Sequence, residues 1–106
     1  KKDDQEEFID QQYQNMHQMF RLVDEALTQM NYMFTHDRHT LTMTHTFNIE
    51  TEINNYRNQL RNQNLDDVDN HLYTYGVGTM YMDIIQECEK LGDYVVNVAE
   101  ARVGVR

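Results

Sequence analysis

Apolar residues recur at alternating steps of three and four through the first third of the chain, and no proline interrupts the sequence anywhere. This spacing keeps side chains on one side of an α-helix, and a chain without proline can continue a helix while the pattern lasts. The sequence therefore predicts a first helix from about residue 4 to 34, which at about 1.5 Å per residue is typical of a bundle. The residues predicted to face its core are Ile9, Tyr13, Met16, Phe20, Val23, Leu27, Met30 and Phe34.

Two further helices are predicted after polar connections. Residues 35–40 separate the first helix from a second at about 41–62, and residues 62–67 precede a third at about 68–102. Strand-like alternation is absent, so the predicted fold is an all-α, antiparallel three-helix bundle that spans residues 1–106 as one domain. Three aspartates are available to cap the start of the third helix: Asp66, Asp67 and Asp69.

The second and third helices repeat the spacing of the first. Gly92 falls in the middle of the third helix, where glycine costs about 1 kcal/mol relative to alanine, so we expect another helix to pack closely there. The predicted core positions of the second helix are Thr46, Ile49, Ile53, Tyr56 and Leu60. Those of the third are Val77, Tyr81, Ile84, Cys88, Leu91, Val95 and Val98.

The charge balance excludes some classes of partner. The chain has 9 Lys and Arg against 18 Asp and Glu, and its net charge of −9 argues against nucleic acid. Such acidity suits metal cations, basic partners or simple solubility. The single cysteine, Cys88, excludes an internal disulfide and a cysteine-based zinc site, and its apolar neighbours favour burial. Because no apolar run approaches about 18 residues, we expect a soluble, intracellular chain. Its start at Lys1 without an initiator methionine indicates a fragment of a longer protein.

One row of oxygen-bearing side chains follows the third helix. Glu89, Asp93 and Asn97 are spaced at i+4, and helical geometry places Glu89 and Asp93 just beyond the apolar arc, with Asn97 further round. Carboxylate and amide oxygens on such a rim suit magnesium, calcium, manganese or iron. A single helix offers too few ligands, and Glu50 with Asn54 is the nearest matching pair elsewhere. The alternative is that these are solvated surface side chains.

Three kinds of catalytic site find little support. A buried di-iron site needs Glu-x-x-His pairs, and no glutamate here has a histidine three residues later. His36 and His39 lie in a predicted connection and are expected to be turn residues. No Ser/His/Asp or Cys/His combination indicates nucleophilic chemistry. A metal-dependent hydrolase would have no candidate nucleophile or base beyond the acids named above. We predict no catalytic residues, no enzyme activity and no bound organic cofactor.

Residues 89–100 resemble the third helix of the PhoU family, which reads roughly Glu-Arg-Ile-Gly-Asp-His-Ala-x-Asn-Ile-Ala-Glu. Residues 81–88 and 47–61 resemble a narrower group, the PhoU-like cytosolic domains that follow the membrane part of bacterial sodium/phosphate cotransporter family proteins. The positions identical to the family pattern are Glu89, Gly92, Asp93, Asn97, Ala99 and Glu100.

The resemblance implies a function and a candidate metal site. Family members carry Glu/Asp-x-x-x-Asp motifs on two neighbouring helices that hold metal ions or clusters. Glu89 and Asp93 match one motif, and Glu50 and Asn54 match the other with asparagine in place of aspartate. The implied site would take a divalent metal or iron through these residues, with Asn97 as a further ligand.

The resemblance also implies partners. A regulatory domain that modulates sodium-dependent phosphate uptake would sit on the cytoplasmic side of the cell membrane, joined to the membrane-embedded cotransporter domain of the same chain. The sequence holds one three-helix repeat, so two copies would pair as a homodimer to complete a six-helix arrangement. The alternative function is a free-standing helical dimerisation module without a transport or metal role.

Overall fold

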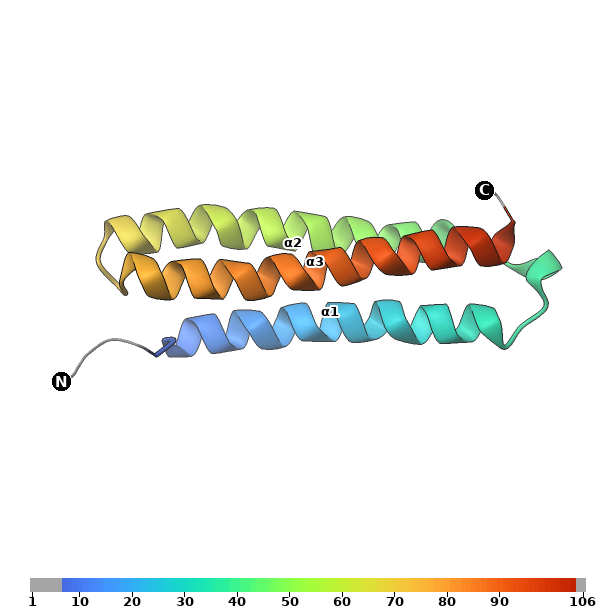
Figure 1. Ribbon diagram of the computed structural model, residues 1–106, viewed down its shortest axis with the longest axis horizontal. Coiled ribbons are helices and arrows are strands. Elements are labelled where there is room, and N and C mark those ends of the chain that lie inside the picture. The colour runs from blue at the N-terminus through green and yellow to red at the C-terminus, as the bar shows by residue number, and fades with distance from the viewer. Residues whose placement is uncertain (1–6, 105–106) are drawn as a thin grey trace.

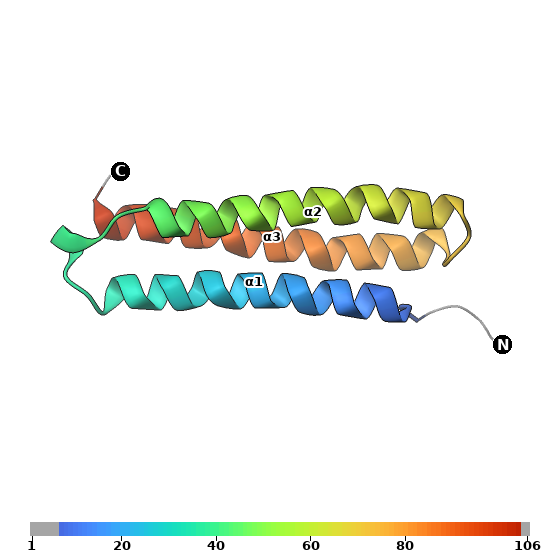
Figure 2. The same ribbon diagram turned by 180° about the vertical axis from the view of Figure 1, so that it is seen from behind.

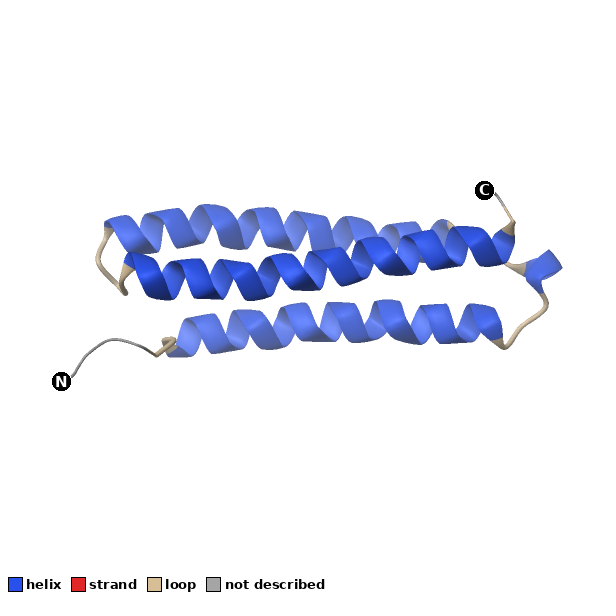
Figure 3. Cartoon of the chain, viewed as in Figure 1, coloured by secondary structure: helices blue, strands red, loops and turns tan. Residues whose placement is uncertain are grey.

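The computed structural model describes residues 7–104 as three long helices: α1 (Asp10–Phe34), α2 (Thr44–Asp69) and α3 (Tyr75–Val103). A short 3-10 helix, η1 (Arg38–Thr40), lies in the connection between α1 and α2. α1 and α3 run in one direction and α2 runs against both, as the two opposite views show (Figures 1 and 2). Residues 7–104 contain helices and connections but no strand (Figure 3). The predicted three-helix bundle is confirmed.

All three helices contribute to one core. The buried residues of α1 include three methionines, which are unbranched and fill irregular space between helices. Ile85 of α3 and Met19 and Met33 of α1 have no exposed surface. None of the helices between residues 7 and 104 combines the length and apolar character needed to cross a bilayer. The residues of the main cluster are Met16, Met19, Val23, Ala26, Ile49, Ile53, Leu60, Tyr81, Met82, Ile85, Cys88 and Val95.

α1 begins later than predicted. The amide N–H of Ile9 donates to Gln12 Oε1 at 3.0 Å, so the Gln12 side chain caps one of the amides that a helix start leaves without a partner. Residues 7–9 precede the helix. The part of the prediction that covers residues 4–6 lies outside the described residues.

The boundary between the second and third helices is also corrected. Residues 62–67, predicted as a connection, continue α2 because the segment contains no glycine or proline to end a helix. α3 then begins at Tyr75 rather than near residue 68, and its N-cap is Thr74, whose hydroxyl accepts from the Val77 amide at 3.2 Å. The predicted N-caps Asp66, Asp67 and Asp69 therefore lie in the last turns of α2.

The core faces of α1 and α3 are rotated relative to the prediction. On α1, Met16 and Val23 are buried as expected. The other buried hydrophobic side chains are Met19, Ala26 and Met33, which lie to one side of the predicted row rather than on it. On α3, Leu91 is 45 % exposed while Ile85 takes a central place. The predicted core residues of α1 that are exposed are Tyr13, Phe20, Leu27 and Phe34.

Candidate functional site

Glu89 lies on the side of α3 that faces α2 and is paired with a cation from that helix. The strip between the two helices that holds Glu50, Asn54, Arg57 and Glu89 is called the α2–α3 groove below. Arg57 Nη1 of α2 lies 3.0 Å from Glu89 Oε1, and the two side chains are 21 % and 20 % exposed. Pairing between half-buried groups is screened less by water than pairing on the surface. Arg57 thus pairs with an acid of the neighbouring helix rather than with an acid of α2.

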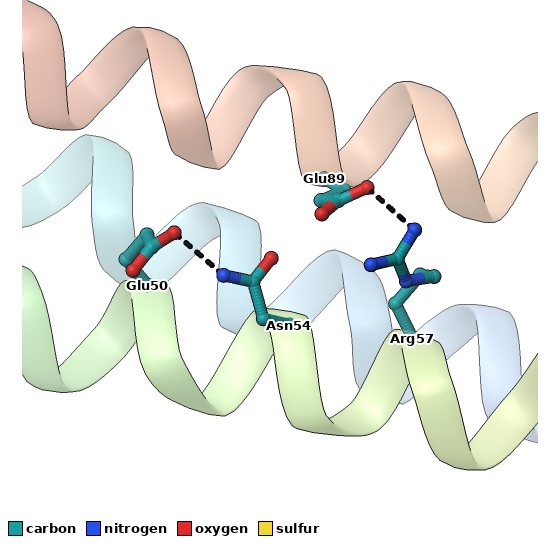
Figure 4. A network of polar contacts seen from close by, with 4 residues as sticks. All are labelled: Glu50, Asn54, Arg57 and Glu89. Carbon is teal, nitrogen blue, oxygen red and sulfur yellow. Dashed lines mark hydrogen bonds and ion pairs between the residues drawn. The ribbon is translucent and has the colours of Figure 1, made fainter.

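A second pair of polar side chains lies on α2 beside this ion pair. Asn54 Nδ2 donates to Glu50 Oε2 at 2.6 Å, so the predicted i, i+4 pair is in contact. Figure 4 shows Glu50, Asn54 and Arg57 projecting from α2 toward α3, with Glu89 between Asn54 and Arg57. The Asn54 side-chain oxygen is turned toward α3, buried and without a hydrogen-bond partner, as is Arg57 Nε. The groove therefore holds one unpaired acceptor and one unpaired donor beside two carboxylates.

Gly92 brings the two helices together at this site. A Cβ at residue 92 would lie 3.1 Å from Ile53 Cδ1, which is tighter than ordinary van der Waals contact. The close helix packing predicted at this glycine is confirmed. Together with the Arg57–Glu89 pair, this contact defines the antiparallel register, in which Glu89 lies opposite the stretch of α2 between Asn54 and Arg57 (Figure 4).

The predicted oxygen row of α3 does not stay in the groove. A step of four residues turns a side chain by about 40° around a helix, so each step from Glu89 leads further from α2. Asp93 and Asn97 are exposed, whereas Glu89 is half-buried. Among residues 7–104, no three His, Cys, Asp or Glu side chains gather closely enough to hold a metal ion. A cation site in this groove would therefore include the Asn54 oxygen.

A polar network near the connection between α2 and α3 was not predicted. The Tyr73 hydroxyl donates to Asn64 Oδ1 at 2.7 Å and lies 3.5 Å from Asp67 Oδ2, while Gln63 donates to the other Asp67 oxygen. Burial, and then the Asp67 carboxylate, raise the pKa of Tyr73 to about 12. The only sign of such a network in the sequence is a run of amide and acidic side chains (residues 62–67) that a tyrosine follows six positions later.

The cysteine and the two histidines considered in the sequence are explained by their positions in the fold. Cys88 is buried and free, and burial raises the pKa of its thiol, so the expectation of a small buried hydrophobe is confirmed. His36 and His39 are exposed in the connection between α1 and α2, as predicted for turn residues. The His36 ring stacks on Tyr32, with ring centroids 3.8 Å apart.

Comparison with known proteins places these features in one family. The family model described as PhoU domain matches residues 16–101, which include most of α1, all of α2 and nearly all of α3. The match contains the groove residues Glu50, Asn54, Arg57 and Glu89. No curated protein and no solved structure matches the chain.

Proposed function

Because this chain belongs to the PhoU domain family, we propose that it is a regulatory domain that adjusts phosphate uptake by a sodium-dependent cotransporter. PhoU domains are helical, regulatory domains associated with the control of phosphate homeostasis. The observation that carries the proposal is the family match across all three helices, which contains all the motif residues from Glu89 to Glu100. The role of the domain is to bind and transmit a signal, without catalysis.

The transport link rests on a narrower resemblance. Residues 47–61 and 81–88 are similar to the domains that follow the membrane part of sodium/phosphate cotransporter proteins. In this proposal the domain lies on the cytoplasmic side and contacts the membrane-embedded part of its own chain. The complete gene product then contains several apolar stretches of about 20 residues before Lys1. A complete gene that encodes only these 106 residues would refute the link.

Uptake of radiolabelled phosphate tests the regulatory role. Cells that carry the complete gene are compared, at low and at high external phosphate, with cells whose gene lacks the codons for residues 7–104. The shortened protein is expected to take up phosphate at a rate that no longer depends on the external concentration. Glu89→Ala is expected to weaken the dependence and Lys90→Ala to leave it intact, since Lys90 is exposed outside the groove. An unchanged dependence after the deletion would contradict the proposal.

A cation site in the α2–α3 groove is part of the proposal. The donor chemistry fits a hard divalent cation or iron, because Glu50, Glu89 and the unpaired Asn54 oxygen are all oxygen ligands. Asp93 lies on the same edge one turn further along, and Asn97 is a peripheral ligand at most, since it points away from α2. A bound cation would supply positive charge that neutralises the carboxylates and links α2 to α3.

Elemental analysis tests this site directly. Protein purified without chelator is expected to carry a divalent metal or iron, and the Glu89→Ala/Asp93→Ala variant is expected to lose it. The control is Glu87→Ala, which removes an exposed acid from the same helix. Protein without metal would mean that these acids act only through charge pairing and hydration.

A second candidate function, a helical dimerisation module, is favoured by one observation. Tyr13, Phe20, Leu27 and Phe34 recur at every seventh residue on α1 and are 46, 47, 38 and 54 % exposed. Seven residues are close to two helical turns, so these side chains form one apolar row on the outside of α1. We propose that this α1 row pairs with the α1 row of a second copy, an arrangement compatible with either function.

A further inference from the structure

We infer that Arg57 is a built-in counter-ion that competes with a divalent cation for the Glu89 carboxylate, an inference that rests on the cation site proposed above. Arg57 Nη1 already lies 3.0 Å from Glu89 Oε1, at the edge of the groove where Glu50 and Asn54 supply further oxygens. Arg57 belongs to neither i, i+4 motif pair. It lies three residues after Asn54, on the same side of α2.

One carboxylate cannot serve both cations fully. A guanidinium that pairs with Glu89 and a divalent ion coordinated by the same carboxylate would be like charges only a few ångströms apart, and in a half-buried groove this repulsion is weakly screened. Binding of the ion therefore requires the guanidinium to move. The side chain has a route to water because 21 % of it is exposed.

The unpaired atoms of the groove favour such an exchange. Arg57 Nε is buried without a partner, so the side chain does not use its full donor set in the groove and regains hydration when it leaves. Asn54 Oδ1 is a buried acceptor without a partner, and a cation in the groove would satisfy it. Exchange of the guanidinium for a cation thus removes both unsatisfied groups.

The charges of the groove determine which cations can compete. While Arg57 is in place, it offsets the charge of Glu89, whereas Glu50 has no cationic partner among residues 7–104. Once Arg57 moves out, both carboxylates face the groove, and a divalent cation neutralises them. A monovalent cation only replaces the charge that the guanidinium already supplied, so the groove favours divalent over monovalent cations.

Titration with Mn²⁺ by calorimetry tests the competition in the wild-type chain, Arg57→Gln and Arg61→Gln. Arg61→Gln is the matched control, because Arg61 is exposed one turn along α2 and its loss changes the net charge equally. Arg57→Gln is expected to bind Mn²⁺ about tenfold more tightly than wild type, and Arg61→Gln within about twofold. Adding Glu89→Gln to Arg57→Gln is expected to abolish the gain.

The outcomes separate this inference from the cation site itself. If the wild-type chain binds Mn²⁺ and the Arg57→Gln and Arg61→Gln variants bind it with equal affinity, the competition is overturned but the cation site stands. If only the Arg57→Gln variant binds Mn²⁺, the guanidinium of Arg57 blocks the site in the wild-type chain, and the competition is supported. Absence of binding in every variant would overturn both. A thermal melt by circular dichroism verifies that each variant is folded.

A second measurement needs no variant. In the wild-type chain, Mg²⁺ is expected to shift the Nε–H resonance of Arg57 in the nitrogen–proton spectrum and to speed its exchange with water. The Nε–H resonance of Arg61 is expected to stay in place. Mg²⁺ binding that leaves the Arg57 signal unchanged would overturn the inference.

Discussion

Gly92 of α3 packs against Ile53 of α2 so closely that an added Cβ would lie 3.1 Å from Ile53 Cδ1. Ile53 itself is 1 % exposed, so it has little free space into which it can withdraw. This contact sits one turn from the Arg57–Glu89 pair and determines how near the two helices lie there. The absence of a single side chain thus shapes the groove that holds the candidate cation site.

Replacing this glycine with a large residue should open the groove. Gly92→Leu is expected to lower the free energy of unfolding by about 1–3 kcal/mol, because an overpacked contact forces helices or rotamers to shift. Chemical denaturation followed by circular dichroism measures the change. Gly76→Leu is the control, since among residues 7–104 the only neighbour within 4 Å of a Cβ there is Thr74 Oγ1 at 3.9 Å. Equal losses at both positions would show that helix packing at Gly92 is not the cause.

The ion pair between helices should contribute more than an exposed pair. A double-mutant cycle of Arg57→Ala and Glu89→Ala is expected to give a coupling energy of about 1 kcal/mol, a modest value because both side chains keep some exposure. The same cycle for Glu87 and Lys90, which are 70 % and 72 % exposed at the same 3.0 Å, should give about 0.3 kcal/mol. If the coupling energy of Arg57 and Glu89 is no larger than that of Glu87 and Lys90, partial burial does not shield the groove pair from water.

Alkaline pH should destabilise the bundle through Tyr73. Its pKa is about 12 in the folded chain and near 10 when unfolded, so the unfolded chain loses this proton first as the pH rises. The stabilisation by Tyr73 is complete below about pH 10 and is lost progressively toward pH 12. The melting temperature should fall over this range, and less steeply in Tyr73→Phe than in the wild type. Tyr75→Phe, at an exposed position, should keep the wild-type slope.

The exposed α1 row should control association. Phe20→Glu is expected to convert a dimer into a monomer at equal concentration, because a charge in an apolar interface is left without a partner. Light scattering during size-exclusion chromatography measures the mass. Thr28→Glu is the control, since Thr28 is exposed on the same helix outside the row. A wild-type chain that is monomeric at all concentrations would refute the pairing.

Helix existence was predictable, but helix ends were not. The polar run at 62–67 resembled a connection by composition, yet Tyr73 returns to bond Asn64 and thereby satisfies polar groups inside a continuous α2. The alternation of threes and fours likewise could not reveal the rotation of α1, because Met16 and Phe20 differ by only about 40° around the helix. Packing against two partners buries Met16 and leaves Phe20 outside.

The sequence predicted which residues form the candidate site, apart from Arg57, but only part of their arrangement. Spacing identified Glu50 with Asn54 and Glu89 with Asp93, and helical geometry predicted that the acids of α3 lie beyond the apolar arc. The antiparallel register brings Asn54 and Glu89 to one groove. The partnership of Arg57 with Glu89 joins residues 32 positions apart, and no local pattern signals a contact of that kind.

The sequence by itself determined that the chain forms three long helices, which oxygen-bearing side chains it carries and that it belongs to the PhoU family, because these depend on local spacing and motif. The tertiary structure alone decided which faces are buried, where α2 ends and which cation neutralises Glu89. Those features depend on how each helix rotates to share one core. Rotation is settled by the summed packing of all three helices, to which each residue contributes only a small part.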